Sequence, residues 1–172
     1  MKTIFITGST DGIGKSAALQ LAQLNHHLIL HGRNSEKLRA TIEEIKLKSK
    51  NQNVTGFLAD LGDLEQTKRL ASEISNAHSH IDVLINNAGV WHSKQEKDTN
   101  NLDMRFVVNY LSPLVLTNML LPLLKKSDNP LLLNLSSAAQ SRVSLQALIG
   151  MQSVSVGEAY AQSKLALTMW TG

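Results

Sequence analysis

Short apolar runs alternate with stretches of helical periodicity along the whole chain. Five of the runs predict β-strands, and their ranges are 2–7, 27–31, 54–58, 81–86 and 131–135. The runs are largely apolar throughout instead of alternating between apolar and polar residues. They therefore indicate strands of a parallel sheet that is covered on both faces.

Residues between these runs follow the spacing of amphipathic helices. The helices are predicted from Ile13, after N-caps at Ser35 and Asp63, over 104–125, and from Gly157 or Glu158 to the end. Repeated strand–helix units with right-handed crossovers form a doubly wound sheet. The predicted fold class is therefore α/β, with a parallel sheet of order 3-2-1-4-5 and helices on both faces. No linker or repeat interrupts the pattern, so residues 1–172 are predicted to form one domain.

Composition narrows the function classes. Aromatic residues are only 4% of the chain and are not interleaved with basic runs, so a nucleic-acid partner is not expected. The chain has no cysteine, and its six histidines show no metal-binding spacing, so neither a disulfide nor a metal site is predicted. The apolar segment 111–124 is too short to span a bilayer and contains Pro113 and Pro122. Without a signal peptide or a span, a cytoplasmic location is expected.

A glycine-rich turn follows the first predicted strand, between Thr7 and Gly14. Glycines let the backbone approach a pyrophosphate closely, and the helix beyond supplies free N–H groups for that anion. The alternative is a tight strand–helix turn without a ligand. The interpretation as a phosphate turn predicts cofactor contacts at Gly8, Ser9, Gly12, Ile13 and Gly14.

The end of the second predicted strand bears on the choice of nicotinamide cofactor. In dinucleotide-binding folds an acidic residue here accepts hydrogen bonds from the adenosine ribose and selects NAD. This chain has Gly32 and Arg33 at that place and no carboxylate. The guanidinium of Arg33 suits a 2′-phosphate, although it could also be an ordinary solvated charge. The sequence therefore favours NADP over NAD.

Tyr160 and Lys164 stand one helical turn apart on the last predicted helix. A lysine ammonium about 4 Å from a phenolate favours it by roughly 4 kcal/mol at an effective dielectric of about 20. This corresponds to roughly three pKa units and brings tyrosine close to neutral pH. Such a pair also occurs by chance on solvated helix faces, so the spacing alone leaves both readings open.

Two further polar positions accompany this pair. Pro113 has no N–H, so it leaves the carbonyl of Asn109 without its normal helical partner and free to hold a water. A merely kinked packing helix is the alternative. Ser136 and Ser137 follow the fifth predicted strand, whose carboxyl end faces the ligand crevice. Adjacent strand residues point to opposite faces, so only one of the two hydroxyls is expected to serve.

These motifs, in this order, resemble those of the short-chain dehydrogenase/reductase family. The residues are the Thr-Gly-x-x-x-Gly-Ile-Gly turn at 7–14, Asn-Asn-Ala-Gly at 86–89 and Tyr-x-x-Ser-Lys at 160–164. The resemblance covers the whole chain. It implies a Rossmann-type fold and an oxidoreductase that interconverts a small-molecule alcohol and a carbonyl with NADP, or less readily with NAD.

The resemblance also implies roles for single residues. Tyr160 would act as general acid and base, and Ser137 would bind the substrate oxygen. Lys164 would stabilise the negative charge of the Tyr160 phenolate and bind the ribose. The Asn109 carbonyl would hold a water that links Lys164 to solvent. Further cofactor contacts are implied for Asp60 and Leu61 at the adenine and for Asn87, Ala88 and Gly89 at the nicotinamide ribose.

The family pattern continues beyond Gly172, so the chain is expected to be a truncated form. The long stretch from Ser137 to Tyr160 and the pair Gly32-Arg33 resemble the retinol-dehydrogenase-like branch. The alternative function is a non-catalytic nucleotide-binding fragment. Relatives pair through two long helices, so a homo-oligomer is a further expectation.

Overall fold

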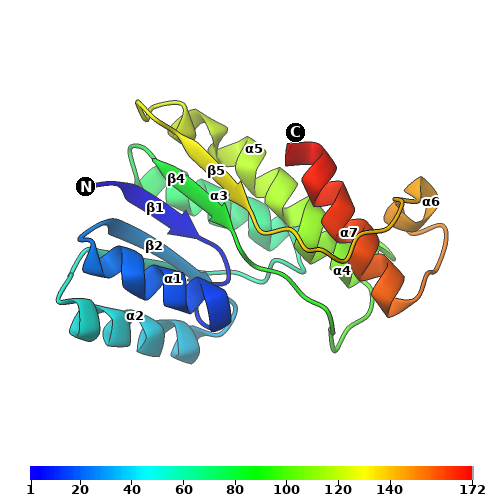
Figure 1. Cartoon of the computed structure of the whole chain (residues 1–172), viewed down its shortest axis with the longest axis horizontal. Coiled ribbons are helices and arrows are strands. Elements are labelled where there is room, and N and C mark those ends of the chain that lie inside the picture. Colours follow the sequence, from blue (N-terminus) through cyan, green and yellow to red (C-terminus); the bar gives the residue numbers. More distant parts are fainter. Residues whose placement is uncertain (172) are drawn as a thin grey trace.

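The computed structural model describes residues 1–171, and its five strands form one parallel sheet of order β3-β2-β1-β4-β5 (Figure 1). The predicted fold class and strand order are confirmed. The strands are β1 (Thr3–Ile6), β2 (His27–Gly32), β3 (Val54–Leu58), β4 (Val83–Asn86) and β5 (Leu131–Asn134). The helices are α1 (Gly12–Gln23), α2 (Ser35–Ser49), α3 (Leu64–Ala77), α4 (Met104–Phe106), the π-helix η1 (Val107–Leu111), α5 (Ser112–Leu124), α6 (Leu145–Leu148) and α7 (Val156–Thr171).

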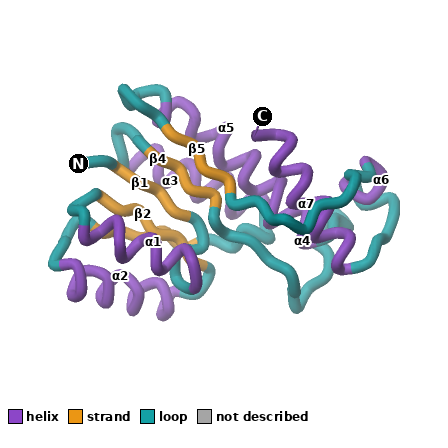
Figure 2. The backbone as a smooth tube through the Cα atoms, in the orientation of Figure 1, coloured by secondary structure: helices purple, strands orange, loops and turns teal. Residues whose placement is uncertain are grey.

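Helices cover both faces of the sheet, with α1 and α2 on one side and α3 and α5 on the other (Figure 2). Successive strand residues point to opposite faces. Phe5 and Ile29 pack into the cluster that includes α3 and α5, whereas Ile4 and Leu30 pack into the cluster with α1 and α2. This double burial explains why the strands read as apolar runs.

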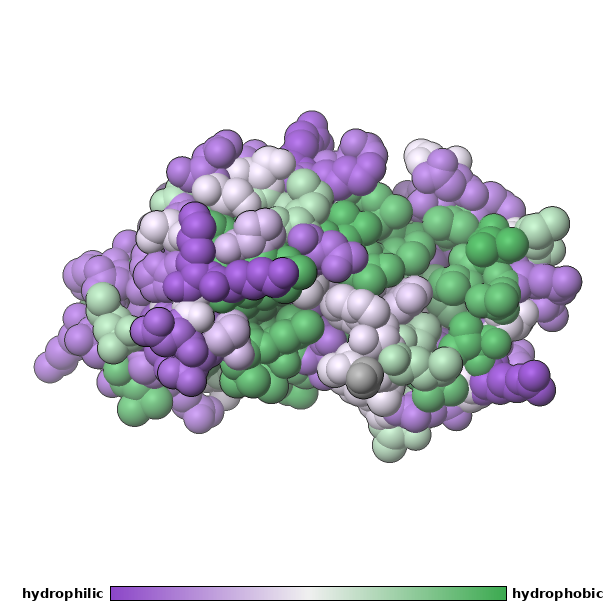
Figure 3. Space-filling view, turned by 90° about the horizontal axis from the view of Figure 1, so that it is seen from above, coloured by the Kyte–Doolittle hydropathy of each residue, from purple (hydrophilic) through white to green (hydrophobic). Residues whose placement is uncertain are grey.

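Strand β5 forms the open edge of the sheet next to β4. Its side chains Leu131 and Leu133 are 46% and 42% exposed. This edge of the sheet therefore exposes apolar side chains. Hydrophobic side chains are visible among hydrophilic ones on the face seen from above (Figure 3). Such an edge is a site for pairing with another chain segment.

One of the two predicted helix N-caps differs from the sequence-based expectation. Asn34, and not Ser35, is the N-cap of α2, because its side-chain Oδ1 accepts a hydrogen bond from the Lys37 N–H at 2.8 Å. Asn and Ser are almost equally good caps, so composition alone does not separate neighbours. Asp63 caps α3 as predicted, by accepting from the backbone N–H groups of residues 65 and 66.

The predicted helix over 104–125 is interrupted by the π-helix η1. Within it the Ser112 N–H donates to the Val107 carbonyl, one residue further back than in an α-helix. Pro113 is the second residue of α5, which begins directly after this segment. A π-helical turn widens the helix and is frequent at functional sites.

Among the described residues, one helical run is long and apolar enough to cross a membrane, and it spans Met104–Leu124. Of its most apolar window, 56% is buried inside the protein, as for a core helix. The apolar segment 111–124 is thus part of a longer helical run, which begins at Met104. The absence of a membrane span stays a prediction.

Candidate functional site

The carboxyl ends of the strands open into one cavity of about 1120 Å³. Most of the site residues that the sequence predicted line it: Gly8, Gly12, Ile13, Gly14, Arg33, Asp60, Leu61, Asn87, Ala88, Gly89, Tyr160 and Lys164. Ser9, Asn109 and Ser137 are not part of the lining. The structure thus joins the glycine turn, the end of β2, the end of β4 and helix α7 around one space.

The glycine turn packs too tightly for side chains at two positions. Gly8 has a φ of +62°, and a Cβ there would lie 2.9 Å from the Ala88 Cα. A Cβ on Gly14 would lie 2.4 Å from Asn87 Nδ2 and 2.5 Å from the Gly8 carbonyl oxygen. The turn can therefore hold this shape only with glycine at both places.

Asn87 ties the end of β4 to this turn. Its Nδ2 donates to the carbonyl oxygens of Thr7 and Gly8 at 2.8 and 2.9 Å. Its backbone N–H donates to the Thr7 hydroxyl at 3.0 Å. The amide thus fixes the two strand ends on either side of the cavity relative to each other.

Ser9 is buried and makes its hydrogen bonds to β2. Its Oγ accepts from the His31 N–H at 2.9 Å and lies 3.2 Å from the His31 carbonyl oxygen. The Ser9 side chain thus binds the turn to the neighbouring strand and does not face the cavity. A direct cofactor contact of this side chain stays a prediction.

His31 was not recognised from the sequence as a site residue. Its ring is buried, with Nδ1 3.1 Å from the Gly8 amide nitrogen and Nε2 3.0 Å from the Ala59 carbonyl oxygen. A polar residue at the end of an apolar strand was the available signal. Burial, opposed by the contacts with Ala59 and Asp60, lowers the pKa of His31 from 6.5 to about 4.

This shift predicts acid instability. Because the folded pKa lies below the unfolded one, the unfolded state binds the proton more tightly. The contribution of His31 to the free energy of unfolding is therefore complete above pH 6.5 and falls as the pH drops toward about 4. The free energy of unfolding lost through His31 is about 3 kcal/mol. Denaturant unfolding of the wild type and of His31→Asn, from pH 7 to pH 4 in steps of about half a pH unit, measures this loss. Parallel pH dependences for the two proteins would refute this origin.

Arg33 is exposed at the rim of the cavity, next to the end of β2. Within residues 1–171 the structure shows no ion pair to its guanidinium, whereas Lys37 nearby pairs with Asp11 at 2.5 Å. Asp60, which follows the neighbouring strand β3, is exposed and accepts from the Gly62 N–H at 2.8 Å. Arg33 therefore has its donors available for an anionic group at this rim.

Tyr160 and Lys164 both reach the cavity from α7. Lys164 Nζ lies 5.9 Å from the centroid of the Tyr160 ring and donates to the Leu135 carbonyl oxygen at 2.7 Å. Burial lowers the pKa of Lys164. The ring of Trp91 packs against Tyr160 with centroids 4.5 Å apart. The lysine and the phenol thus share one wall of the site, held by β5 and by the segment after β4.

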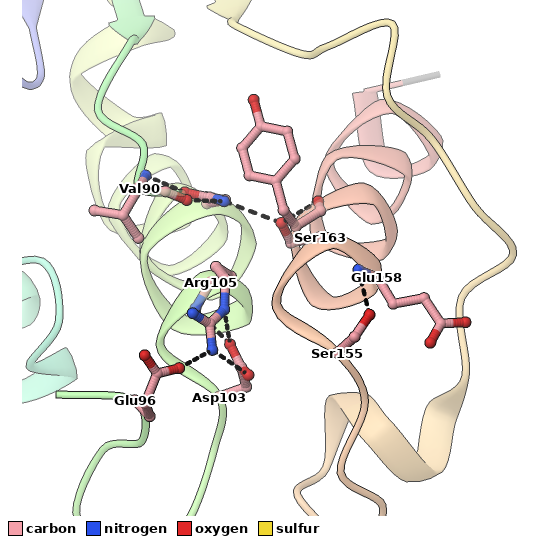
Figure 4. A network of polar contacts seen from close by, with 9 residues as sticks. Val90, Glu96, Asp103, Arg105, Ser155, Glu158 and Ser163 are labelled. Atoms are coloured by element: carbon pink, nitrogen blue, oxygen red, sulfur yellow. Dashed lines mark hydrogen bonds and ion pairs between the residues drawn. The ribbon is translucent and has the colours of Figure 1, made fainter. Parts of the chain in front are cut away.

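Asn109 lies in η1 and acts through its side chain. Its Oδ1 accepts from the Val90 N–H at 2.7 Å, and its Nδ2 donates to the Val90 carbonyl at 3.0 Å and to Ser163 Oγ at 3.0 Å. Figure 4 shows this chain of contacts between Val90 and Ser163. The residue therefore clamps the β4 segment to α7. The role of its main-chain carbonyl stays a prediction.

The two serines after β5 make different contacts. Ser136 lines the cavity, and its Oγ lies 2.5 Å from Thr168 Oγ1 and 3.3 Å from the Lys164 carbonyl oxygen. Ser137 Oγ accepts from the Ala139 N–H at 3.1 Å and stays outside the lining. The assignment of Ser137 to the substrate oxygen is untested by this geometry.

Arg105 is a second residue that the sequence reasoning missed. Its buried guanidinium pairs with Glu96 at 2.5 Å and with Asp103 at 2.7 Å (Figure 4). It thereby holds the segment between β4 and α4, which carries Trp91 into the cavity. The signal was a lone arginine at the start of an apolar helix.

Comparison with known proteins agrees with this arrangement. The model of the short chain dehydrogenase family matches residues 2–172. Human retinol dehydrogenase 13 and human polyprenol dehydrogenase are each 35% identical to this protein, over 99% of its chain. The alignments cover 52% and 53% of the lengths of these two relatives. A solved structure from Escherichia coli CFT073, complexed with NADPH, is 34% identical with a TM-score of 0.76, over 96% of this chain and 66% of that one. The chain thus spans about half the length of the curated relatives it matches. The chain belongs to the short chain dehydrogenase family.

Proposed function

We propose that this protein binds NADP and interconverts an alcohol and a carbonyl, with Tyr160 as the proton carrier. The supporting observation is the single cavity that joins the glycine turn and Arg33 to Tyr160 and Lys164. A dinucleotide needs an anion-binding turn and a reaction centre at opposite ends of one crevice.

The residues present fit such a cofactor. Gly8 and Gly14 line the cavity at a turn in which an added Cβ would meet neighbouring atoms, so glycine at both places keeps the turn in the shape that would bind a pyrophosphate. The guanidinium of Arg33 suits a 2′-phosphate. A Cβ on Gly89 would lie 3.3 Å from Lys164 Nζ, so this glycine keeps the space beside the lysine narrow but open. The related structure from Escherichia coli CFT073 holds NADPH.

The proposed mechanism assigns the proton to the protein. The cofactor supplies or accepts the hydride when it is bound. In the direction of reduction, the Tyr160 hydroxyl gives its proton to the substrate oxygen as the carbon receives the hydride; in oxidation, the phenolate takes that proton back. Lys164 stabilises the phenolate by its charge, and the Leu135 carbonyl fixes the position of its ammonium.

A second candidate function is nucleotide binding without turnover. The observation that favours it is that the cofactor-binding residues line the cavity, while Ser137, the proposed ligand of the substrate oxygen, does not. Steady-state oxidation of NADPH with a panel of aldehydes and ketones separates the two. Turnover supports the oxidoreductase, whereas tight NADPH binding without any turnover supports the second function.

Replacing Arg33 by alanine is expected to weaken NADPH binding by about 10- to 100-fold, because charge-assisted hydrogen bonds to the 2′-phosphate contribute about 1.5–3 kcal/mol. NADH affinity should remain unchanged. Fluorescence titration with both cofactors measures the effect. Arg39→Ala is a matched control, because Arg39 is exposed on α2 and does not line the cavity. An equal loss for NADPH and NADH would contradict a 2′-phosphate contact.

A further inference from the structure

A buried imidazole connects the two halves of the proposed nucleotide site. His31, at the end of β2, is 3% exposed and lies between the turn after β1 and the end of β3. Its Nδ1 is 3.1 Å from the Gly8 nitrogen, and its Nε2 is 3.0 Å from the Ala59 oxygen. Gly8 begins the glycine turn, and Ala59 precedes Asp60, so both contacts end at residues of the cavity lining.

The partners of His31 fix its protonation state. A backbone N–H can only donate, so Nδ1 must accept from Gly8. A carbonyl oxygen can only accept, so Nε2 must carry the proton that bonds to Ala59. The ring is thus neutral and in the Nε2–H tautomer. A second proton on Nδ1 would place two donors against each other and break the contact with Gly8.

We propose that His31 is a positioning residue for dinucleotide binding, whose neutral ring holds the Gly8 N–H and thereby sets the glycine turn against the adenine end of the cavity. Protonation of His31 releases the turn, so dinucleotide affinity falls in acid. This role of His31 rests on the proposed function, because it assumes that the cavity binds NADP.

Charges around His31 are few. Asp60, after β3, is the charged group that opposes the effect of burial on the pKa of the ring. The turn after β1 contributes the hydroxyl of Ser9, which bonds the His31 backbone and does not titrate in this range. Arg33 lies two residues further along its own strand end. A 2′-phosphate on the ligand also titrates. The test therefore compares the pH dependence of affinity between the wild type and a variant that bind the same ligand.

Two substitutions separate the contacts of the ring. In His31→Asn the side-chain oxygen takes the place of Nδ1 and can accept from Gly8, while the contact with Ala59 is lost. In His31→Gln the longer amide reaches the place of Nε2 and can donate to Ala59, while Gly8 loses its acceptor. Each variant places an amide in the site and removes one of the two hydrogen bonds. Each is therefore the matched control for the other.

Calorimetric titration with NADP⁺, which is stable in acid, tests the proposal between about pH 7.5 and about pH 3.5. The range must reach this far, because a ring with a pKa of about 4 takes up its second proton only at the acid end. At neutral pH His31→Asn should bind within about threefold of the wild type, and His31→Gln about tenfold or more weakly. Toward acid, the wild type should lose affinity relative to His31→Asn, which cannot be protonated. Equal affinities of the two variants, or parallel pH profiles of the wild type and His31→Asn, would overturn it.

A measurement without ligand keeps the result independent of the proposed function. Hydrogen exchange of the Gly8 amide should be slow in the wild type and in His31→Asn, and faster in His31→Gln. The nitrogen shifts of His31 should show the Nε2–H tautomer. Should the wild type fail to bind NADP⁺, the proposed function fails, and amide exchange alone decides on His31. Equal exchange in the two variants then overturns its positioning role.

Discussion

Replacement of Tyr160 by phenylalanine is expected to lower turnover by about 100- to 10,000-fold, the usual contribution of a positioned general acid–base group. NADPH affinity should stay within about threefold, because the substitution removes only the hydroxyl. The phenyl ring can keep its contact with Trp91, at 4.5 Å between centroids. The variant should therefore bind its cofactor normally and fail at proton transfer.

Single-turnover oxidation of bound NADPH by a reactive aldehyde measures this loss. Tyr110→Phe is the matched control, because Tyr110 lies in η1, outside the cavity lining, and also loses only a hydroxyl. The control should react like the wild type. Unchanged turnover of Tyr160→Phe would remove this residue from the mechanism.

Replacement of Gly14 by alanine is expected to weaken NADPH binding by about 100-fold or more, since it disturbs the turn that faces the pyrophosphate. The new Cβ would lie 2.4 Å from Asn87 Nδ2 and 2.5 Å from the Gly8 oxygen. Asn87 cannot move away at low cost, because Nδ2 donates to the Thr7 and Gly8 carbonyls. The substitution therefore displaces the backbone of the turn itself.

Calorimetric titration with NADPH and thermal unfolding, measured on the same samples, separate loss of the site from loss of the fold. Gly157→Ala is the control, because nothing lies within 4 Å of an added Cβ in α7. It should bind NADPH normally and unfold at the same or a higher temperature, since alanine favours helix more than glycine. Normal binding by a folded Gly14→Ala protein would contradict the phosphate-turn assignment.

The architecture could be predicted because hydrophobic burial repeats along the chain. The strands are apolar on both faces, and right-handed crossovers then leave few topologies. Local boundaries were less predictable. Asn34 and Ser35 are nearly equal as caps, and the strand ends lie within two residues of the expected positions. The π-helix before Pro113 could not be foreseen, because which carbonyl an N–H chooses depends on the packing around the helix.

The site was predictable where backbone geometry determines it. Glycines and the strand ends reach the cavity through main-chain placement, so their positions follow from the topology. Side chains in irregular segments were harder. Ser137 follows β5, where strand alternation no longer sets direction, and its hydroxyl bonds to the Ala139 N–H. His31 was overlooked because its importance comes from its contacts with Gly8 and Ala59, which are distant in the sequence and follow the two strands that neighbour β2.

The central claim is that one dinucleotide spans the cavity from the glycine turn to Tyr160. Titration of the ¹⁵N-labelled chain with NADPH, followed by amide chemical shifts, tests it most directly. The account predicts saturable changes at Gly8, Gly14, Arg33 and Gly89 and at the amides around Tyr160, with little change at the far ends of the strands. No shift change, or changes confined to residues outside the cavity lining, would contradict it.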